Sequence, residues 1–255
     1  MTHPLILILL AGLLASCGAE PPRVPSLPKK EPVAEVGYTA PPTVTKVAAS
    51  AEGLLLSGQG PSGASIRLAS PDGLVLETRA SAKGDWQLTV PPASGVRLFG
   101  LSTTQGTRTV QAQGYVLLTP QGQGHLLRAG GGAQAIGAVT IPAITAIDFD
   151  REGAVVVSGT VPAGSSVTIR ADGRQGADGR ANSLGRFAIS LPQPLSPGSH
   201  SLRVFSNGTE RSVTLDMSPA ASLVEGPFRS TSTTAGLRVD WMTPGGGVQS
   251  TVILK

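Results

Sequence analysis

Residues 52–70 read EGLLLSGQGPSGASIRLAS, and residues 152–172 return the same pattern as EGAVVVSGTVPAGSSVTIRAD. Both copies carry a Ser-Gly pair, then a proline, then a glycine, and then two apolar residues that alternate with polar ones. The match continues from KGDWQL at 83–88 to LGRFAI at 184–189. Because self-similarity at a fixed spacing is the signature of repeated units, the chain is expected to hold two copies of one structural module.

Alternating apolar residues predict where the strands of the second copy lie. Five strands are expected, at 155–158, 166–171, 186–191, 201–205 and 210–217. Asn207-Gly208 lies between the last two and is a strong signal for a tight hairpin turn, and Gln105-Gly106 stands at the equivalent place in the first copy. Short strands with Gly and Pro turns, and no helical period over a long window, predict an all-β fold of antiparallel sandwiches.

The shared pattern S-G … P-x-G-[AS]-x-[VI] … G-x-[WF]-x-[LI] … G-x-[HR]-x-[FL] resembles the bacterial immunoglobulin-like modules of envelope and surface proteins. The resemblance covers about 44–113 and 144–217. It implies two tandem immunoglobulin-like β-sandwiches that serve as a scaffold or an interaction module. Trp86 and Phe187 are then expected to be core aromatics of the two sandwiches rather than ligand-stacking residues.

The repeats divide the chain into segments. Sandwich 1 is expected at 44–118 and sandwich 2 at 143–218, joined by a Gly/Gln-rich linker at 119–142 with one added strand around 115–118. The C-terminal segment, 219–255, carries an alternating run, a TPGGG turn and a returning run, which predict a β-hairpin. The hairpin either completes the protein's own sheet or docks on a partner, in which case Trp241, Gly245, Gly246 and Gly247 are the candidate interaction residues.

The amino-terminal segment predicts export and lipid attachment. The apolar run at 4–14 is too short to cross a bilayer as a helix and is typical of a secretory signal. Leu14-Ala15-Ser16-Cys17 resembles the lipobox of bacterial lipoproteins. That resemblance implies a signal peptide at 1–16, cleavage between Ser16 and Cys17, acylation of Cys17 with chains such as palmitate, and delivery to the outer membrane.

A Pro-rich tether is expected to separate this anchor from the folded part. The segment 17–43 follows the cleavage site, and seven prolines lie between Ala19 and Pro42. Such a composition is typical of an extended, semi-rigid spacer. With Cys17, the single cysteine of the chain, acylated, no thiol remains for a disulfide, so packing alone is expected to hold the fold.

Neither the charge nor the motifs of the chain indicate an enzyme. The net charge of +4 is mild and the basic residues are scattered, which gives no support to nucleic-acid binding. His125 and His200 are expected in a linker and a turn, away from any His or Cys cluster with metal-ligand spacing. No nucleophile elbow, phosphate-binding loop or dinucleotide fingerprint occurs, so no catalytic residue, metal or cofactor is predicted.

Four aspartates of the second copy are considered as possible ligands of a cation. Asp148 and Asp150 flank Phe149, and Asp172 and Asp178 lie in a DGRQGADG stretch. Carboxylates two residues apart could share a calcium ion, but no full coordinating loop is present, so these residues are interpreted as solvated turn acids.

The sequence therefore predicts a non-enzymatic outer-membrane lipoprotein, anchored by lipid, that acts as a scaffold or protein-interaction module in the cell envelope. The alternative hypothesis is a peptidoglycan- or polysaccharide-binding envelope protein, with a cell-wall glycan as its ligand. Two Trp and two Tyr offer little surface for sugar stacking, which favours the first hypothesis.

Overall fold

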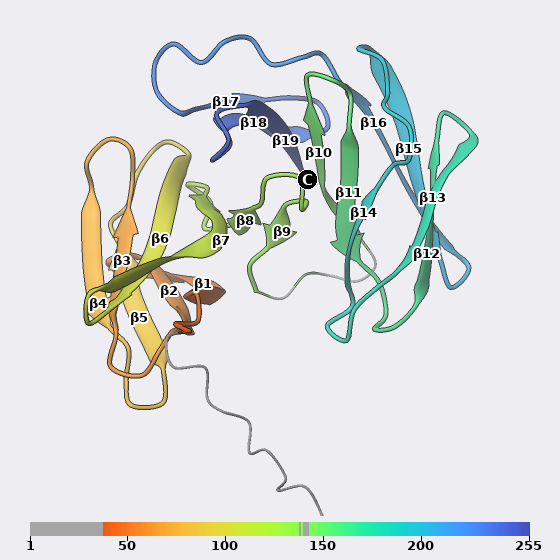
Figure 1. Ribbon diagram of the computed structural model, residues 1–255. Helices are drawn as coiled ribbons and strands as arrows, with labels where there is room; N and C mark the ends of the chain where they lie inside the picture. Colours follow the sequence, from red (N-terminus) through yellow and green to blue (C-terminus); the bar gives the residue numbers. More distant parts are fainter. Residues whose placement is uncertain (1–37, 138, 140–142) are drawn as a thin grey trace, which may run out of the picture. The chain divides into compact units, whose positions relative to one another are not determined.

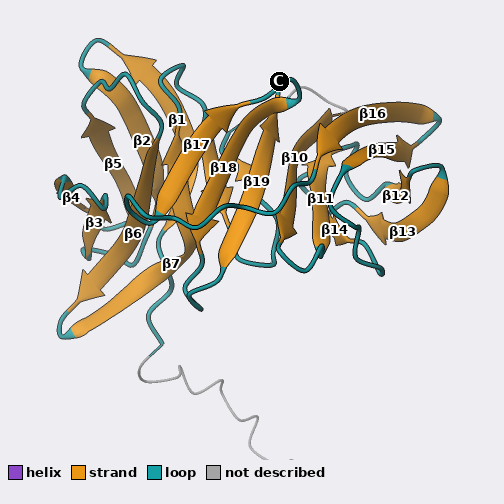
Figure 2. Cartoon of the chain, turned by 90° about the horizontal axis from the view of Figure 1, so that it is seen from above, coloured by secondary structure: helices purple, strands orange, loops and turns teal. Residues whose placement is uncertain are grey.

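The chain is all-β, as predicted, in the residues described by the computed structural model, which are 38–137, 139 and 143–255. Every regular element among them is a strand (Figure 2). Residues Thr39–Lys255 form one compact unit. Within the described ranges, no helix has the length and hydropathy that crossing a membrane requires. The predicted signal peptide, the Ser16–Cys17 cleavage site and most of the tether lie outside the described residues.

The first sandwich is built from two antiparallel sheets that pack face to face (Figure 1). Its seven module strands are β1 (Thr43–Ser50), β2 (Gly53–Gln59), β3 (Ser65–Ala69), β4 (Val75–Arg79), β5 (Asp85–Val90), β6 (Arg97–Gln105) and β7 (Arg108–Leu118). One sheet has the order β1-β2-β5, and the other has the order β4-β3-β6-β7. Two further strands, β8 (Gly124–Leu127) and β9 (Gln134–Ala135), extend the second sheet beyond β7.

The second sandwich repeats this plan strand for strand. Its module strands are β10 (Ala143–Asp150), β11 (Val155–Thr160), β12 (Ser166–Ala171), β13 (Arg174–Arg180), β14 (Arg186–Ser190), β15 (Ser199–Ser206) and β16 (Thr209–Asp216). The orders β10-β11-β14 and β13-β12-β15-β16 match those of the first sandwich. Even the irregularity in the first strand recurs, between Val44 and Lys46 and between Ile144 and Ala146. The predicted repeat is therefore a repeat of topology as well as of sequence.

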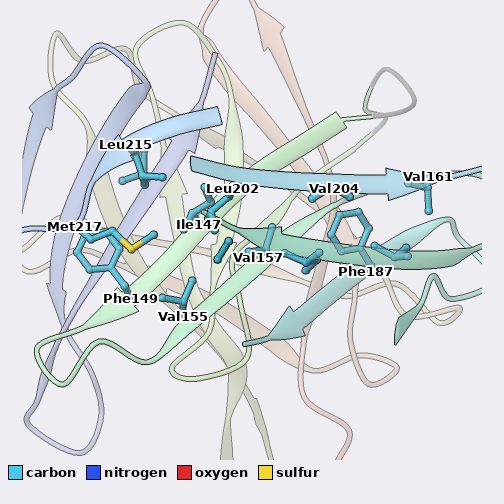
Figure 3. Packing of buried hydrophobic residues seen from close by; sticks show 14 of the residues in the cluster. Ile147, Phe149, Val155, Val157, Val161, Phe187, Leu202, Val204, Leu215 and Met217 are labelled. Atoms are coloured by element: carbon cyan, nitrogen blue, oxygen red, sulfur yellow. The ribbon is translucent and has the colours of Figure 1, made fainter. Parts of the chain in front are cut away.

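Each sandwich holds its own apolar core. Trp86 and Phe187, which the repeat places at equivalent positions, are 2% and 5% exposed and contribute to the two cores, as predicted. Figure 3 shows Phe187 toward one end of the second core and Phe149 and Met217 toward the other. Burial of one such side chain contributes roughly 1.5–3 kcal/mol to the stability of its module.

In both copies, the glycine of the repeated Ser-Gly pair lies directly against the core aromatic ring. A Cβ added to Gly58 would lie 2.5 Å from the Trp86 ring and 1.8 Å from the carbonyl oxygen of Thr43. A Cβ added to Gly159 would meet the Phe187 ring at 2.6 Å and the Ala143 carbonyl at 2.3 Å. Both glycines therefore admit an aromatic ring and a neighbouring strand where any side chain would collide.

Replacement of Gly58 with alanine is expected to destabilise the protein by about 1–3 kcal/mol, because the first strand must shift away from the second. Gly95→Ala is the matched control, since nothing lies within 4 Å of its added Cβ and its φ is not positive. Urea denaturation of both variants measures the difference. Equal stabilities would show that the close approach at Gly58 is not required.

The five strands expected in the second copy are present as β11, β12, β14, β15 and β16, and the Asn207-Gly208 turn joins β15 to β16. Both turn residues have positive φ, 47° and 74°, as a tight hairpin turn of this type requires. The interpretation of Asp178 as a turn acid is wrong, because it lies in the edge strand β13 and accepts a hydrogen bond from Thr168 at 2.6 Å. The strand β13 could not be predicted from alternating apolar residues, because its sequence is rich in glycine and charged residues.

The Gly/Gln-rich segment 119–142 is more than a linker. It contributes β8 and β9 to the first sandwich, and His125, Leu127 and Ala133 within it are buried. The strand expected around 115–118 is the end of β7 and not a separate element. Backbone pairing of β8 with β7 explains why a segment of such composition is ordered at these positions.

The C-terminal segment forms the predicted hairpin and adds one strand to it. β18 (Gly236–Met242) and β19 (Val248–Leu254) pair across the TPGGG turn, and β17 (Phe228–Ser232) pairs with the outer side of β18. β19 also pairs with β10, so the full order of this sheet is β14-β11-β10-β19-β18-β17. The last strand thus completes the protein's own sheet and has no edge left to add to a partner's sheet.

Candidate interaction site at the junction of the sandwiches

The strands β10, β11 and β19, at the centre of their sheet, are largely buried on both faces. One face packs into the core of the second sandwich, and the other carries buried residues that join a third apolar cluster. This cluster comprises Leu98, Leu117, Leu127, Ala133, Ala146, Val239, Trp241 and Ile253. Because it combines residues of β6, β7 and β8 with residues of β10, β18 and β19, it joins the two sandwiches.

A buried carboxylate lies at the centre of this junction. Asp148, which is 2% exposed, accepts hydrogen bonds from the backbone N–H of Ala133 at 2.7 Å and from Thr251 Oγ1 at 2.5 Å. Gln249 Nε2 donates to the same carboxylate at 2.9 Å, while Gln249 Oε1 accepts from the N–H of Gly130 at 3.0 Å. Asp148 on β10 thereby fixes the loop that crosses from the first sandwich.

Burial raises the pKa of Asp148, and the hydrogen bonds from Thr251, Ala133 and Gln249 oppose that increase. All three partners are donors, and a carboxylate offers acceptor oxygens to each of them. The expectation that Asp148 is a solvated turn acid is therefore wrong. Its burial depends on a segment that lies far away in the sequence.

Trp241 closes the same junction from the C-terminal hairpin. Its side chain is fully buried, and its Nε1 donates to Thr251 Oγ1 at 3.0 Å. Its ring meets that of Tyr115 on β7 edge to face, with centroids 5.7 Å apart and an interplanar angle of 86°. Thr251 therefore links Trp241 to Asp148 in one hydrogen-bonded chain across the junction.

The strand β7 changes its pairing halfway along its length. Tyr115–Leu118 pair with β6 on one side and with β8 on the other. Between Gly100 and Ser102 of β6, the opposing strand holds the three residues Ala112, Gln113 and Gly114, which makes a bulge. Gly114 has a φ of 145°, and a Cβ there would lie 2.3 Å from the carbonyl oxygen of Leu127.

Residues 109–113 of β7 have one unpaired edge in the described part of the chain. Arg108–Gln111 pair with β6, but β8 ends opposite Tyr115 because the chain turns away after Leu127. That turn is closed by a hydrogen bond from the N–H of Gly131 to the carbonyl of Arg128 at 3.1 Å. The backbone donors and acceptors on this side of 109–113, which we call the β7 edge, are therefore left for another strand.

A cavity of about 470 Å³ lies beside the β7 edge. Its lining includes Gln111, Gly114, Tyr115, Arg128, Trp241 and Pro244, and it is mainly apolar. Strand pairing along the β7 edge and side-chain burial in the cavity are thus available next to each other. This combination is the feature of the junction best suited to binding an extended chain.

The structure separates the predicted interaction residues. Trp241 lines the cavity while remaining buried, and Gly246 and Gly247 line a different hollow with Asp150 and Arg151. Gly245 has open space at its Cβ position and belongs to the exposed turn. The β7 edge itself was missed by sequence reasoning, and the only signal for it was a glycine, Gly114, inside a strand pattern.

The two histidines lie in strands rather than in a linker and a turn. His125 is buried in β8, and burial lowers its pKa to about 4. His200 of β15 is bonded through Nδ1 to Asp172 at 2.7 Å, which raises the pKa of the histidine and lowers that of the carboxylate. Within the described residues, no group of three or more His, Cys, Asp or Glu side chains is arranged to hold a metal ion.

No family model matches the chain, and no curated protein sequence matches it. Among solved structures it is similar to "Biofilm associated protein - BSP domain", with 14% identity and a TM-score of 0.25 over 72% of this chain. The chain spans 30% of the length of that structure. It is also similar to "Central Fibronectin-III array of RIM-binding protein", with 10% identity, a TM-score of 0.27, and coverage of 85% of this chain and 87% of that one.

Proposed function

We propose that this chain is a lipid-anchored, non-enzymatic protein of the cell envelope that binds an extended segment of a partner protein along the β7 edge. The single observation that carries the proposal is the unpaired β7 edge beside a cavity of about 470 Å³. An unpaired edge is a ready template for another strand, because its N–H and C=O groups require partners. The cavity supplies the pockets in which alternate side chains of that strand are buried.

Comparison of the two modules supports the choice of this edge. The corresponding strand in the second sandwich, β16, also lies at the end of its sheet. Gln111 of β7, in contrast, lines a cavity, and the residues that follow it form a bulge. Since bulges are enriched where proteins redirect a strand near functional sites, the first module has the feature that a binding edge needs.

The experiment that tests the proposal is site-specific photo-crosslinking in intact cells. A photoreactive residue at Gln111, an exposed position that lines the cavity, is expected to give an adduct with an envelope protein. Ser212, an exposed position of β16, is the matched control and is expected to give none. Adducts from Ser212 alone, or from neither position, would contradict the proposal.

Anchoring to the outer membrane is the second part of the proposal, and the lipobox resemblance of Leu14-Ala15-Ser16-Cys17 supports it. Two or more acyl chains hold a protein stably on a membrane, since each buried methylene contributes about 0.8 kcal/mol. Metabolic labelling with palmitate is expected to mark the wild type and to be lost completely in Cys17→Ala. If Cys17→Ala stays as firmly membrane-bound as the wild type, the anchor is elsewhere.

Glycan binding is the alternative proposal. Sugars bind to exposed faces of aromatic rings, and the two tryptophans, Trp86 and Trp241, are buried. Sedimentation with purified cell-wall sacculi at low salt separates the two functions. Co-sedimentation that survives loss of the photo-crosslinked partner would favour the glycan.

A further inference from the structure

A second, smaller cavity is lined in part by the loop that Asp148 fixes, and two arginines that form no ion pair among the described residues line it. Its volume is about 100 Å³, and its lining includes Arg128, Gln134, Thr160, Asn182 and Arg186. Thr160 and Arg186 are directly paired across β11 and β14. Arg128 and Gln134 reach the cavity from the segment that follows β8.

The two guanidinium groups are bonded only to neutral acceptors in the described part of the chain. Arg128 donates from Nε to the carbonyl of Gly132 at 3.2 Å and from Nη2 to that of Gly131 at 2.9 Å. Arg186 donates from Nη2 to the carbonyl of Gly137 at 3.1 Å. With its amide oxygen turned toward Arg186, Gln134 accepts from Nε at 3.2 Å. Each guanidinium has five N–H donors, so donors remain on both.

Neither arginine forms an ion pair in the described part of the chain, although the charge of Arg128 acts electrostatically on the buried carboxylate of Asp148. The burial of Arg186 and the nearby charge of Arg128, in that order, lower the pKa of the Arg186 guanidinium. Like charges that share a partly buried site repel each other, and a bound anion would reduce this repulsion between the two guanidinium groups. An arginine pair is also the arrangement that suits carboxylate and phosphate oxygens geometrically.

A buried hydroxyl provides an independent indication of a ligand. Thr160 is 7% exposed, lines the cavity, and its Oγ1 has no hydrogen-bond partner among the described residues. An unsatisfied buried polar group costs about 1–3 kcal/mol, so native proteins give such groups a partner. An acceptor oxygen placed in the cavity would bond this hydroxyl and lie close to both arginines.

The cavity size restricts the ligand. Since one water occupies about 30 Å³ in the liquid, a space of this size holds a few heavy atoms and no sugar ring with its substituents. We propose that the Arg128–Thr160–Arg186 cavity binds a small oxyanion, either a phosphate group or a carboxylate, with the two guanidinium groups balancing its charge and the Thr160 hydroxyl donating to it. This site is distinct from the β7 edge, although Arg128 lines both cavities, and Thr160 and Arg186 line only this one.

Titration of the purified full-length protein in detergent with inorganic phosphate and, separately, with acetate tests this inference. Ionic strength is held constant with sodium chloride. Binding to the native state alone raises Tm with ligand concentration, so a saturable rise is expected with at least one of the two anions. A rise with phosphate alone identifies a phosphate site, and a rise with acetate alone identifies a carboxylate site.

Variants connect the response to the cavity. Thr160→Val removes the hydroxyl at nearly constant volume and is expected to weaken anion affinity about tenfold or more, whereas Thr160→Ser is expected to retain it. Arg186→Gln is expected to abolish the rise in Tm, and Arg174→Gln, an exposed arginine on β13, to leave it unchanged. If Arg186→Gln does not fold, the comparison of anion affinity between Thr160→Val and Thr160→Ser tests the inference instead. No anion dependence in the wild type, or an equal response in Thr160→Val, would overturn the inference.

Discussion

The Asp148→Ala variant is expected to lose about 3–5 kcal/mol of unfolding free energy, because three buried donors lose their acceptor and each unsatisfied donor costs about 1–3 kcal/mol. Those donors are the N–H of Ala133, Thr251 Oγ1 and Gln249 Nε2. Relief of the buried charge offsets part of the cost. Urea denaturation followed by circular dichroism measures the change.

Asp216→Ala is the control for this variant, since that carboxylate is exposed at the end of β16 and its removal is expected to change stability by less than about 0.5 kcal/mol. Asp148→Asn is expected to fall between the wild type and Asp148→Ala. It retains one acceptor oxygen but turns an amide N–H₂ toward donors. A loss below about 1 kcal/mol in Asp148→Ala would mean that Asp148 does not fix the crossing loop.

The Trp241→Ala variant is expected to be destabilised by about 3–5 kcal/mol, the range found when a fully buried aromatic is truncated. It loses the contact with Tyr115 and the hydrogen bond to Thr251 together. Trp241→Phe keeps an aromatic ring and is expected to lose about 1 kcal/mol, from the missing N–H donor. Met242→Ala, at the adjacent half-exposed position, is expected to be nearly neutral.

The Trp241 and Asp148 effects should not add. Both residues bond the hydroxyl of Thr251, so a double-mutant cycle is expected to show a coupling energy of about 0.5–3 kcal/mol. Strict additivity would contradict the hydrogen-bonded chain that links the hairpin to β10. Denaturation curves of the two single variants, the double variant and the wild type provide all four values.

The repeat made the module strands predictable, because each buried strand alternates apolar and polar residues. The edge strands β4 and β13 of the two modules were not predicted. They begin at the exposed residues Val75 and Arg174, and their interiors carry charges or glycines. β10 was also missed: Ile147 and Phe149 alternate with Asp148 and Asp150, but the two aspartates were interpreted as turn acids, whereas Asp148 is buried. These three segments are strands because of their pairing and packing in the folded protein, and not because of a local sequence preference.

The candidate site was far less predictable. The hairpin around Trp241 follows from local alternation, but the burial of Asp148 depends on Ala133 and Gln249, which are distant in sequence. The β7 edge depends on where β8 turns away, and the Gly-rich stretch at 129–132 reads as a flexible linker in the sequence. Long-range contacts of this kind leave no periodic signal in a single sequence.

The most direct test of the central claim, that a partner strand pairs with the β7 edge, is amide hydrogen exchange at 109–113 in the free protein and in the complex isolated with its partner. Tyr115–Leu118, which lie between β6 and β8, are the internal standard and should be protected in both states. The amides on the open side of 109–113 are expected to exchange rapidly in the free protein and slowly in the complex. Slow exchange of all these amides in the free protein, or unchanged exchange in the complex, would contradict the account.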